Sequence, residues 1–187
     1  MRIQSFTQRI LQELSSYVER IQDEDFVELL TAIQQARHIF LSGAGRSGLC
    51  VQAFANRLLH LNFRVSVVGE ITAPHAQKDD VLILASGSGE TPRLVALAHQ
   101  AKRIGLPIAC ITLDSHSTLA QLSSIVIVLP GTSPKRQPTA SFTPSFQPMG
   151  SAYEQFCFLI YDAIVLELMD QRKITSEQMF QNHANLE

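Results

Sequence analysis

Apolar residues recur at two different spacings along the chain, and the change of spacing divides it. Within residues 1–36 they return every three or four positions, as in Ile3, Phe6 and Ile10, which predicts two amphipathic helices. Between residues 38 and 130 they gather instead in short unbroken runs, at 38–43, 65–70, 81–86, 107–112 and 125–130. Unbroken apolar runs of this length are typical of strands in a parallel sheet that is covered on both faces.

Helical stretches separate most of these runs, notably 47–61 and 91–104. Strands that alternate with helices predict an α/β fold, a three-layer, doubly wound parallel sheet, here with an N-terminal helical extension. Residues 131–148 are rich in Pro, Ser and Thr, which predicts a long surface loop, and 150–187 predict C-terminal helices. We expect 1–187 to form a single domain.

Composition and charge narrow the function classes. The chain has 187 residues, 45% of them hydrophobic, and a net charge of −2 at pH 7. This charge gives no positive footprint for nucleic acid or for an anionic membrane. No apolar run approaches the roughly 20 residues that cross a bilayer, and the first helix lacks the apolar centre of a signal peptide. Cys50, Cys110 and Cys157 lie far apart among apolar neighbours, which favours buried thiols and a cytoplasmic location.

Two of the predicted strands end in glycine- and serine-rich turns that lead directly into predicted helices. Residues 42–48 read SGAGRSG after the first run, and residues 86–91 read SGSGET after the third. Glycines let the backbone approach a ligand closely, and the N–H groups at the start of a helix favour an anion. We therefore predict a phosphate site made of two sets of residues: Gly45, Arg46 and Ser47 in the first turn, and Ser86, Gly87, Ser88 and Thr91 in the second.

A nucleotide site fits these turns less well. Gly43, Gly45 and Gly48 match the G-x-G-x-x-G pattern only in letters, and no P-loop lysine follows either turn. Apart from Glu70, no acidic residue ends the second strand in a ribose-binding role. The hydroxyl groups of SGSGET suit a terminal phosphate monoester better than a bridging pyrophosphate, although a serine-rich turn could also only cap a helix. No nicotinamide, flavin or nucleotide cofactor is expected.

Five segments together resemble the 6-phospho-3-hexuloisomerase family, which is built on the sugar isomerase (SIS) domain. They are GAGRSGL, VVGE-x-T, SGSGET, P-M-G-S-x-Y-E and the final NHANLE. SGSGET is shared across SIS domains, whereas the last two segments select this family. The resemblance implies a five-stranded flavodoxin-like sheet and a homo-oligomer, commonly a tetramer. It also implies interconversion of D-arabino-hex-3-ulose 6-phosphate and D-fructose 6-phosphate, the second step of the ribulose monophosphate pathway of formaldehyde fixation.

Such an isomerase needs a base. Moving a carbonyl from C3 to C2 removes a proton from C2 and delivers one to C3, and one base can do both through a cis-enediol(ate) intermediate. Glu154 is the first candidate, because it is the glutamate of P-M-G-S-x-Y-E near the start of an apolar helix; alternatively it only favours the helix dipole. His183 is the second candidate, as a proton shuttle or a polariser of the enediolate oxygens, supplied within a subunit or to a neighbour. Its alternative is a solvated surface histidine.

Several further assignments follow. Arg46 could bind phosphate or substrate oxygens or simply lie at the surface, and Glu70 and Thr72 are candidate substrate contacts. No metal site is expected, because the six histidines form no H-x-H or H-x-x-x-H pair and the cysteines are isolated. Two alternative functions stay open: another SIS sugar-phosphate isomerase, such as an arabinose 5-phosphate isomerase, and a non-catalytic SIS module that senses a sugar phosphate.

Overall fold

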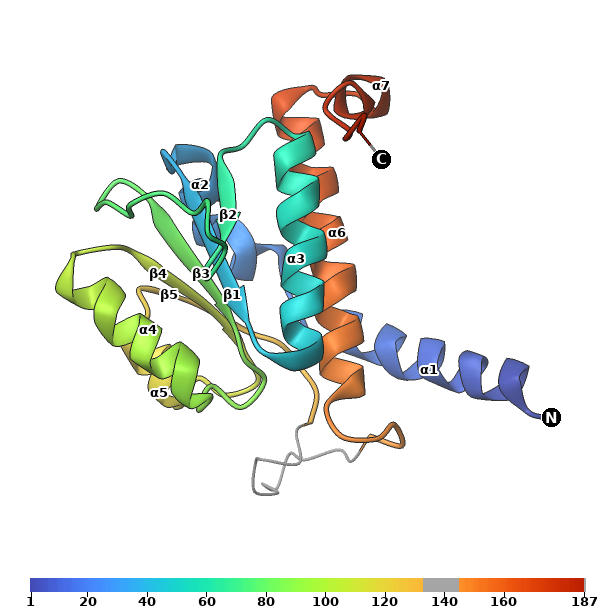
Figure 1. Ribbon diagram of the computed structural model, residues 1–187. Helices are drawn as coiled ribbons and strands as arrows, with labels where there is room; N and C mark the ends of the chain where they lie inside the picture. Colours follow the sequence, from blue (N-terminus) through green and yellow to red (C-terminus); the bar gives the residue numbers. More distant parts are fainter. Residues whose placement is uncertain (133–144, 187) are drawn as a thin grey trace.

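The computed structural model describes residues 1–132 and 145–186, and its centre is a five-stranded parallel sheet (Figure 1). The strand order is β2-β1-β3-β4-β5, and every neighbouring pair is parallel. The strands are β1 (Ile39–Gly43), β2 (Val65–Val67), β3 (Val81–Ala85), β4 (Ile108–Thr112) and β5 (Ile125–Val128). Each strand lies within one of the five apolar runs, so the predicted parallel α/β sheet is confirmed.

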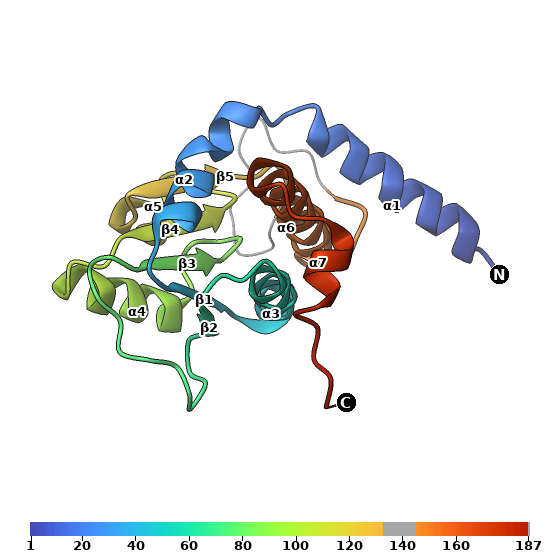
Figure 2. The same cartoon turned by 90° about the horizontal axis from the view of Figure 1, so that it is seen from above.

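Helices cover both faces of the sheet. In chain order the helices are α1 (Ile3–Val18), α2 (Val27–Gln35), α3 (Gly45–His60), α4 (Pro92–Arg103), α5 (Thr118–Leu122), α6 (Ser151–Arg172) and α7 (Ser176–Phe180), with a 3-10 turn at Asp23–Phe26. Figure 2 shows α3 and α6 side by side on one face, with α4 and α5 on the other. The three layers match the predicted architecture. No helix in the described part of the chain is long and apolar enough to cross a membrane.

Alternating burial explains why the strand sequences are unbroken apolar runs. In β1, Ile39 and Leu41 pack into the core under α3 and α6, whereas Phe40 packs into the core under α4. In β3, Leu82 and Leu84 likewise face the α4 side. Because a strand turns successive side chains to opposite faces, a sheet with two covered faces needs apolar residues at every position.

The second strand is shorter than the sequence predicted. The apolar run suggested 65–70, but β2 ends at Val67. Gly69 follows with a φ of +103°, and the Glu70 carboxylate accepts a hydrogen bond from the Val67 N–H at 3.3 Å, which closes a tight turn. No helix joins β2 to β3, so a loop covers this part of the sheet.

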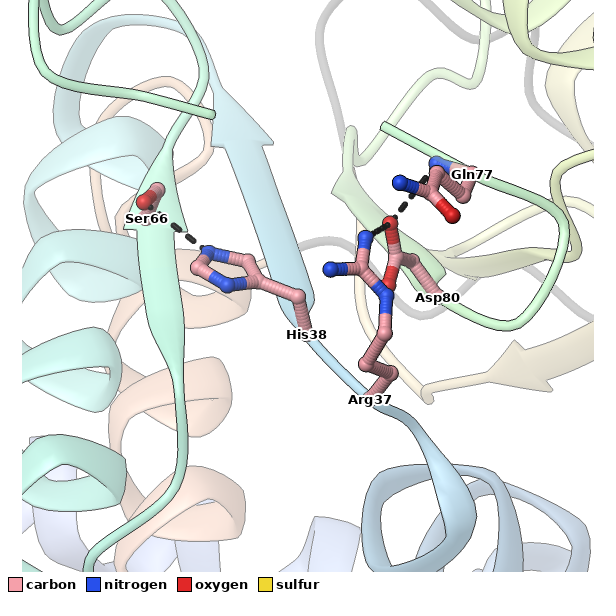
Figure 3. Close-up of polar contacts among 5 residues, drawn as sticks. All are labelled: Arg37, His38, Ser66, Gln77 and Asp80. Atoms are coloured by element: carbon pink, nitrogen blue, oxygen red, sulfur yellow. Dashed lines mark hydrogen bonds and ion pairs between the residues drawn. The ribbon is translucent and has the colours of Figure 1, made fainter. Parts of the chain in front are cut away.

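At the amino ends of the strands, polar side chains bind one another (Figure 3). Arg37, just before β1, forms a 2.7 Å ion pair with Asp80, just before β3, and the same carboxylate oxygen accepts the Gln77 N–H at 2.7 Å. Beside this pair, Nε2 of His38 lies 3.0 Å from the Ser66 hydroxyl of β2. These contacts tie together the starts of β1, β2 and β3.

The N-terminal helix stands apart from the sheet. Only Leu14 and Tyr17 of α1 are buried, and the helix contacts α6 while its first turns extend away from the rest of the molecule (Figures 1 and 2). The predicted loop at 131–148 lies largely outside the described residues. Its last residues, 145–148, are described and run beneath α1 into the start of α6.

Candidate active site

A cavity of about 440 Å³ opens at the carboxyl ends of β1 and β3. In the order β2-β1-β3-β4-β5, the chain reverses its direction of travel between these two strands, and open α/β sheets bind ligands at that point. Three segments line the cavity: residues 44–47 after β1, residues 85–88 with Thr91 at the end of β3 and beyond, and residues 148–151 with Tyr153 and Glu154 around the start of α6. The seven predicted phosphate-site residues of the two turns all lie along it.

The first turn is built on close backbone contacts. A Cβ atom on Gly43 would come within 2.9 Å of the Gly48 Cα, so β1 can pack against the first turn of α3 only because both residues are glycines. Gly45 has a φ of +58°, in the region that favours glycine. This turn places the backbone of Arg46 and Ser47 along the cavity.

The second turn is held by its own hydroxyl groups. The Ser86 and Thr91 hydroxyls lie 2.9 Å apart, and the Ser86 hydroxyl also accepts the Gly89 N–H at 3.2 Å. Glu90, the acidic residue of SGSGET, points to another element: its two carboxylate oxygens accept the Thr118 N–H at 2.6 Å and the Thr118 hydroxyl at 2.8 Å, at the start of α5. Glu90 therefore fixes the turn and is not a cavity residue.

Three helices begin at the cavity. They are α3 at Gly45, α4 just after Thr91, and α6 at Ser151. Among the described residues, no N-cap side chain accepts a hydrogen bond in these three helices, whereas Ser117 caps α5 and Thr175 caps α7. Uncapped first-turn N–H groups and the partial positive charge of a helix N-terminus make a binding site for an anion. The geometry thus supports the predicted phosphate site.

Glu154 lies in the first turn of α6, on the wall of this cavity. Its Oε2 atom forms a 2.5 Å ion pair with Nε of Arg46, from the first turn of α3. The two partners differ in exposure: the Glu154 side chain is 18% exposed and the Arg46 side chain 63%. The structure therefore brings together the predicted base and the predicted cation, with the cation on the solvent side.

Neighbouring residues fix the start of α6. The buried Tyr153 donates its hydroxyl hydrogen to the Ile111 carbonyl of β4 at 2.8 Å, and its ring packs on Gly87, where a Cβ atom would come within 3.1 Å. Cys50 of α3 donates its thiol to the Glu154 carbonyl at 3.3 Å. Burial raises the pKa of the Cys50 thiol, and the nearby Glu154 charge raises it further, so this cysteine stays protonated.

His183 lies at the opposite end of the molecule. It follows α7, where its ring stacks on His60, with centroids 5.3 Å apart, and on Phe180 at 5.8 Å. The helix α6 has 22 residues and is therefore about 33 Å long, with Glu154 at its start and α7 beyond its end (Figure 1). The structure does not bring His183 and Glu154 together within one chain.

Glu70 and Thr72 also lie outside the cavity lining. Both are exposed on the loop after β2, and the Glu70 carboxylate closes the turn at the end of that strand. Their predicted contact with substrate stays a prediction.

Sequence reasoning overlooked the segment just before α6. Pro148, Met149, Gly150 and Ser151 line the cavity, and Met149 is a non-glycine residue with a φ of +56°. The P-M-G-S-x-Y-E segment contained this signal, but only its glutamate was assigned. Among residues 1–132 and 145–186, no three His, Cys, Asp or Glu side chains are grouped to hold a metal ion.

Comparisons with known proteins show the family to which the chain is related. The family model described as the SIS domain matches residues 32–159. The chain is 40% identical to 3-hexulose-6-phosphate isomerase of Bacillus subtilis over 187 residues, all of both chains. It is 35% identical to the enzyme of that name from Mycobacterium gastri, over 94% of this chain and 86% of the relative. A solved structure from Methanococcus jannaschii, for which 3-hexulose-6-phosphate isomerase function was inferred, matches with a TM-score of 0.80 and 31% identity, over 97% and 96% of the two chains.

Proposed function

The chain belongs to the SIS domain family, and relatives that it matches over most of their length are named 3-hexulose-6-phosphate isomerase, so we propose that it is one itself. It interconverts D-arabino-hex-3-ulose 6-phosphate and D-fructose 6-phosphate, an activity also called 6-phospho-3-hexuloisomerase. The observation that carries this proposal is the cavity at the β1 and β3 ends, where three uncapped helix N-termini surround one carboxylate, Glu154.

The phosphate group binds the 86–91 turn. The Ser88 hydroxyl and the one hydroxyl of the Ser86–Thr91 pair that does not donate to the other donate to its oxygens. Among the described residues no hydrogen bond uses the N–H groups of Gly87 and Ser88, which leaves them available. A glycine is needed at position 87 because the Tyr153 ring packs against it and leaves no room for a Cβ atom. On the other side of the cavity, Gly45 and Ser47 offer the first turn of α3.

Glu154 acts as the base. It removes the proton from C2 or C3 and returns it to the other carbon of the cis-enediolate, so one carboxylate serves both half-reactions. Its position on the wall, 18% exposed, limits competition from water. Helix N-termini and hydrogen-bond donors stabilise the negative charge that develops on the enediolate oxygens.

Arg46 links phosphate binding to the base. Without a ligand its guanidinium is paired with Glu154, so the arginine charge lies against the carboxylate. When the substrate enters, the Arg46 guanidinium moves to the substrate oxygens, and the Glu154 carboxylate then faces C2 and C3 of the substrate. Its exposure of 63% supports this movement, since few contacts restrain the guanidinium.

His183 requires a second subunit. Because α6 separates it from Glu154 within one chain, it reaches a cavity only if the chain is a homo-oligomer, for which we propose a tetramer, in which one subunit presents its C-terminal segment to another. There it polarises the enediolate oxygens or shuttles their protons. The three cysteines are free thiols, two of them buried, which supports a reducing cytoplasm as the site of action.

The first experiment is turnover. D-arabino-hex-3-ulose 6-phosphate is generated enzymatically, and fructose 6-phosphate formation is followed with EDTA present and absent. We expect rapid conversion that the chelator does not change, because a carboxylate carries the proton. Binding of fructose 6-phosphate without conversion would instead favour a sensing module, and the absence of both would favour another sugar phosphate, such as arabinose 5-phosphate.

A further inference from the structure

The N-terminal helix contacts the wall of the cavity from outside. Nε2 of Gln147 donates to Oε2 of Glu13 in α1 at 3.0 Å, and the Arg9 guanidinium lies over the Phe146 ring, 4.2 Å from its centroid. Gln147 is 7% exposed, so its side chain is packed between α1 and the body of the protein. Two consecutive residues of the segment that leads into α6 are thus held by α1.

Glu13 is itself fixed. Its other carboxylate oxygen, Oε1, accepts a hydrogen bond from the Tyr17 hydroxyl at 3.1 Å. Tyr17 is buried, and its ring packs edge-on against Phe156 of α6, with centroids 5.5 Å apart. Burial raises the pKa of Tyr17, so the hydroxyl remains a donor to the carboxylate. Both oxygens of Glu13 therefore have a defined partner.

A short covalent path connects Gln147 to the base. Pro148, Met149 and Gly150 line the cavity and lead into the first turn of α6, where the Glu154 N–H donates to the Gly150 carbonyl at 3.0 Å. Met149 has a φ of +56°, a conformation that a non-glycine residue keeps only when its surroundings impose it. The Met149 side chain is exposed, so its own contacts do not fix this backbone conformation. Gln147, two residues earlier, is buried and hydrogen-bonded to Glu13.

We propose that Glu13 and Gln147 are positioning residues of the active site. Their hydrogen bond holds Met149 in its left-handed conformation and sets the start of α6, and with it Glu154, relative to the two phosphate-binding turns. The helix α1, which lies outside the α/β layers, is then part of the catalytic scaffold. This inference rests on the proposed function for its kinetic readout, but the position of the wall can be measured separately.

A polarity swap tests the pair. Gln147→Glu places a second carboxylate 3.0 Å from Glu13, in place of the donor. In the double variant Glu13→Gln with Gln147→Glu, the introduced carboxamide donates to the introduced carboxylate and still accepts from Tyr17. Gln12→Glu, on the exposed side of α1, is the matched control for an added charge.

We expect Gln147→Glu to lower kcat roughly 10- to 100-fold, since small displacements of a catalytic group have effects of this size. KM should change little, because the phosphate turns are intact. The double variant should recover kcat to within about threefold of the wild type, as expected for a directly coupled pair. Amide hydrogen exchange at Ser151 and Glu154, whose N–H groups donate to the Pro148 and Gly150 carbonyls, should rise in the single variant and return in the double variant, with Gln12→Glu unchanged.

Two results would overturn the inference: wild-type kcat in Gln147→Glu, or a double variant that folds but regains neither kcat nor protection at the Ser151 and Glu154 amides. If Gln147→Glu does not fold, Gln147→Leu removes the donor without adding charge, and the same loss of kcat and of protection is required of it. If the wild type shows no turnover, the proposed function fails, and hydrogen exchange at the Ser151 and Glu154 amides alone decides the positioning role.

Discussion

The two ends of the sheet carry polar residues of similar kinds but use them in opposite ways. At the amino ends, Arg37 and Asp80 form a 2.7 Å ion pair, and the Ser66 hydroxyl lies 3.0 Å from His38 (Figure 3). At the carboxyl ends, Arg46 and Glu154 also form an ion pair, but they line a cavity of about 440 Å³ together with Ser88 and the starts of three uncapped helices.

The two ion pairs differ in burial and in whether a ligand can reach them. The Asp80 side chain has no exposed surface and serves β1 and β3 as a cross-link. The Arg46–Glu154 pair faces a space that a ligand can fill, and its arginine is 63% exposed. We therefore expect the buried Arg37–Asp80 pair to contribute to stability. We expect the Arg46–Glu154 pair, which lies beside a cavity and unpaired N–H donors, to contribute to binding and chemistry. Substitutions at the two ends should therefore change different properties of the protein.

Glu154→Gln should have the largest effect, and on activity alone. Removing the base should lower kcat about 10²- to 10⁴-fold, the usual contribution of a general base. Fructose 6-phosphate binding should persist, and the free energy of unfolding should change by less than about 1 kcal/mol, because the lost ion pair is largely exposed on the arginine side. Turnover, titration calorimetry and urea unfolding measure the three. Glu167→Gln, farther along α6, is the control; a kcat within threefold of wild type in Glu154→Gln would rule out this base.

Arg37→Met should have the opposite profile. The substitution keeps the apolar stem but leaves the fully buried Asp80 carboxylate without its cation, which should cost about 2 kcal/mol of unfolding free energy. At 25 °C, kcat and KM should match those of the wild type, because the cavity lies at the other end of the strands. Urea unfolding and steady-state kinetics test this. A change in KM with unchanged stability would contradict the division between the two ends.

The same serine-to-alanine substitution can be made at each end of the sheet. Ser88→Ala should raise KM about five- to tenfold, since one hydrogen bond to a charged phosphate is worth about 1 to 1.5 kcal/mol, without altering stability. Ser66→Ala should cost about 1 kcal/mol of unfolding free energy through the lost His38 contact and leave KM unchanged. The two assays are run on both variants. Identical profiles for the two substitutions would mean that the serines are equivalent.

Much of this arrangement could be predicted from the sequence because it depends on local pattern. Unbroken apolar runs located all five strands, since both faces of the sheet are covered. Glycine and hydroxyl residues directly after the first and third runs located the cavity, because parallel strands place their carboxyl ends at the same edge. The end of β2 at Val67 was not evident, because a single turn, closed by Glu70 and Gly69, decides where this strand ends.

Pairs that are distant in sequence had no local signal. Glu154 and Arg46 are 108 positions apart, and Gln147 and Glu13 are 134 apart. No periodicity indicates such partners, since each side chain alone is compatible with a surface position. The place of His183 could have been deduced from topology: α6 begins at the carboxyl edge and runs the length of the sheet, so residues beyond α7 lie at the amino edge.

The smallest predicted effect is a loss of stability at acidic pH that arises from His38, at the amino ends of the strands. Burial lowers the pKa of His38 below its ordinary 6.5, the Arg37 and Arg64 charges lower it further, and Asp80 opposes them. The folded protein therefore holds this proton less tightly than the unfolded chain. The contribution of His38 to the free energy of unfolding should be fully present above pH 6.5 and should be lost as the pH decreases through and below that value.

Urea unfolding of the wild type and of His38→Gln between pH 7.5 and 5.5 measures this dependence. The carboxamide can still contact Ser66 but does not titrate, so the variant should lose stability less steeply as the pH falls. Some pH dependence should remain, because burial and the Arg57 and His183 charges also lower the pKa of His60. Turnover of His38→Gln at pH 7.5 should equal that of the wild type, as the division between the ends requires. Equal slopes for the two proteins would show that His38 is exposed enough to titrate normally, and that the polar cluster at the amino end is looser than its contacts indicate.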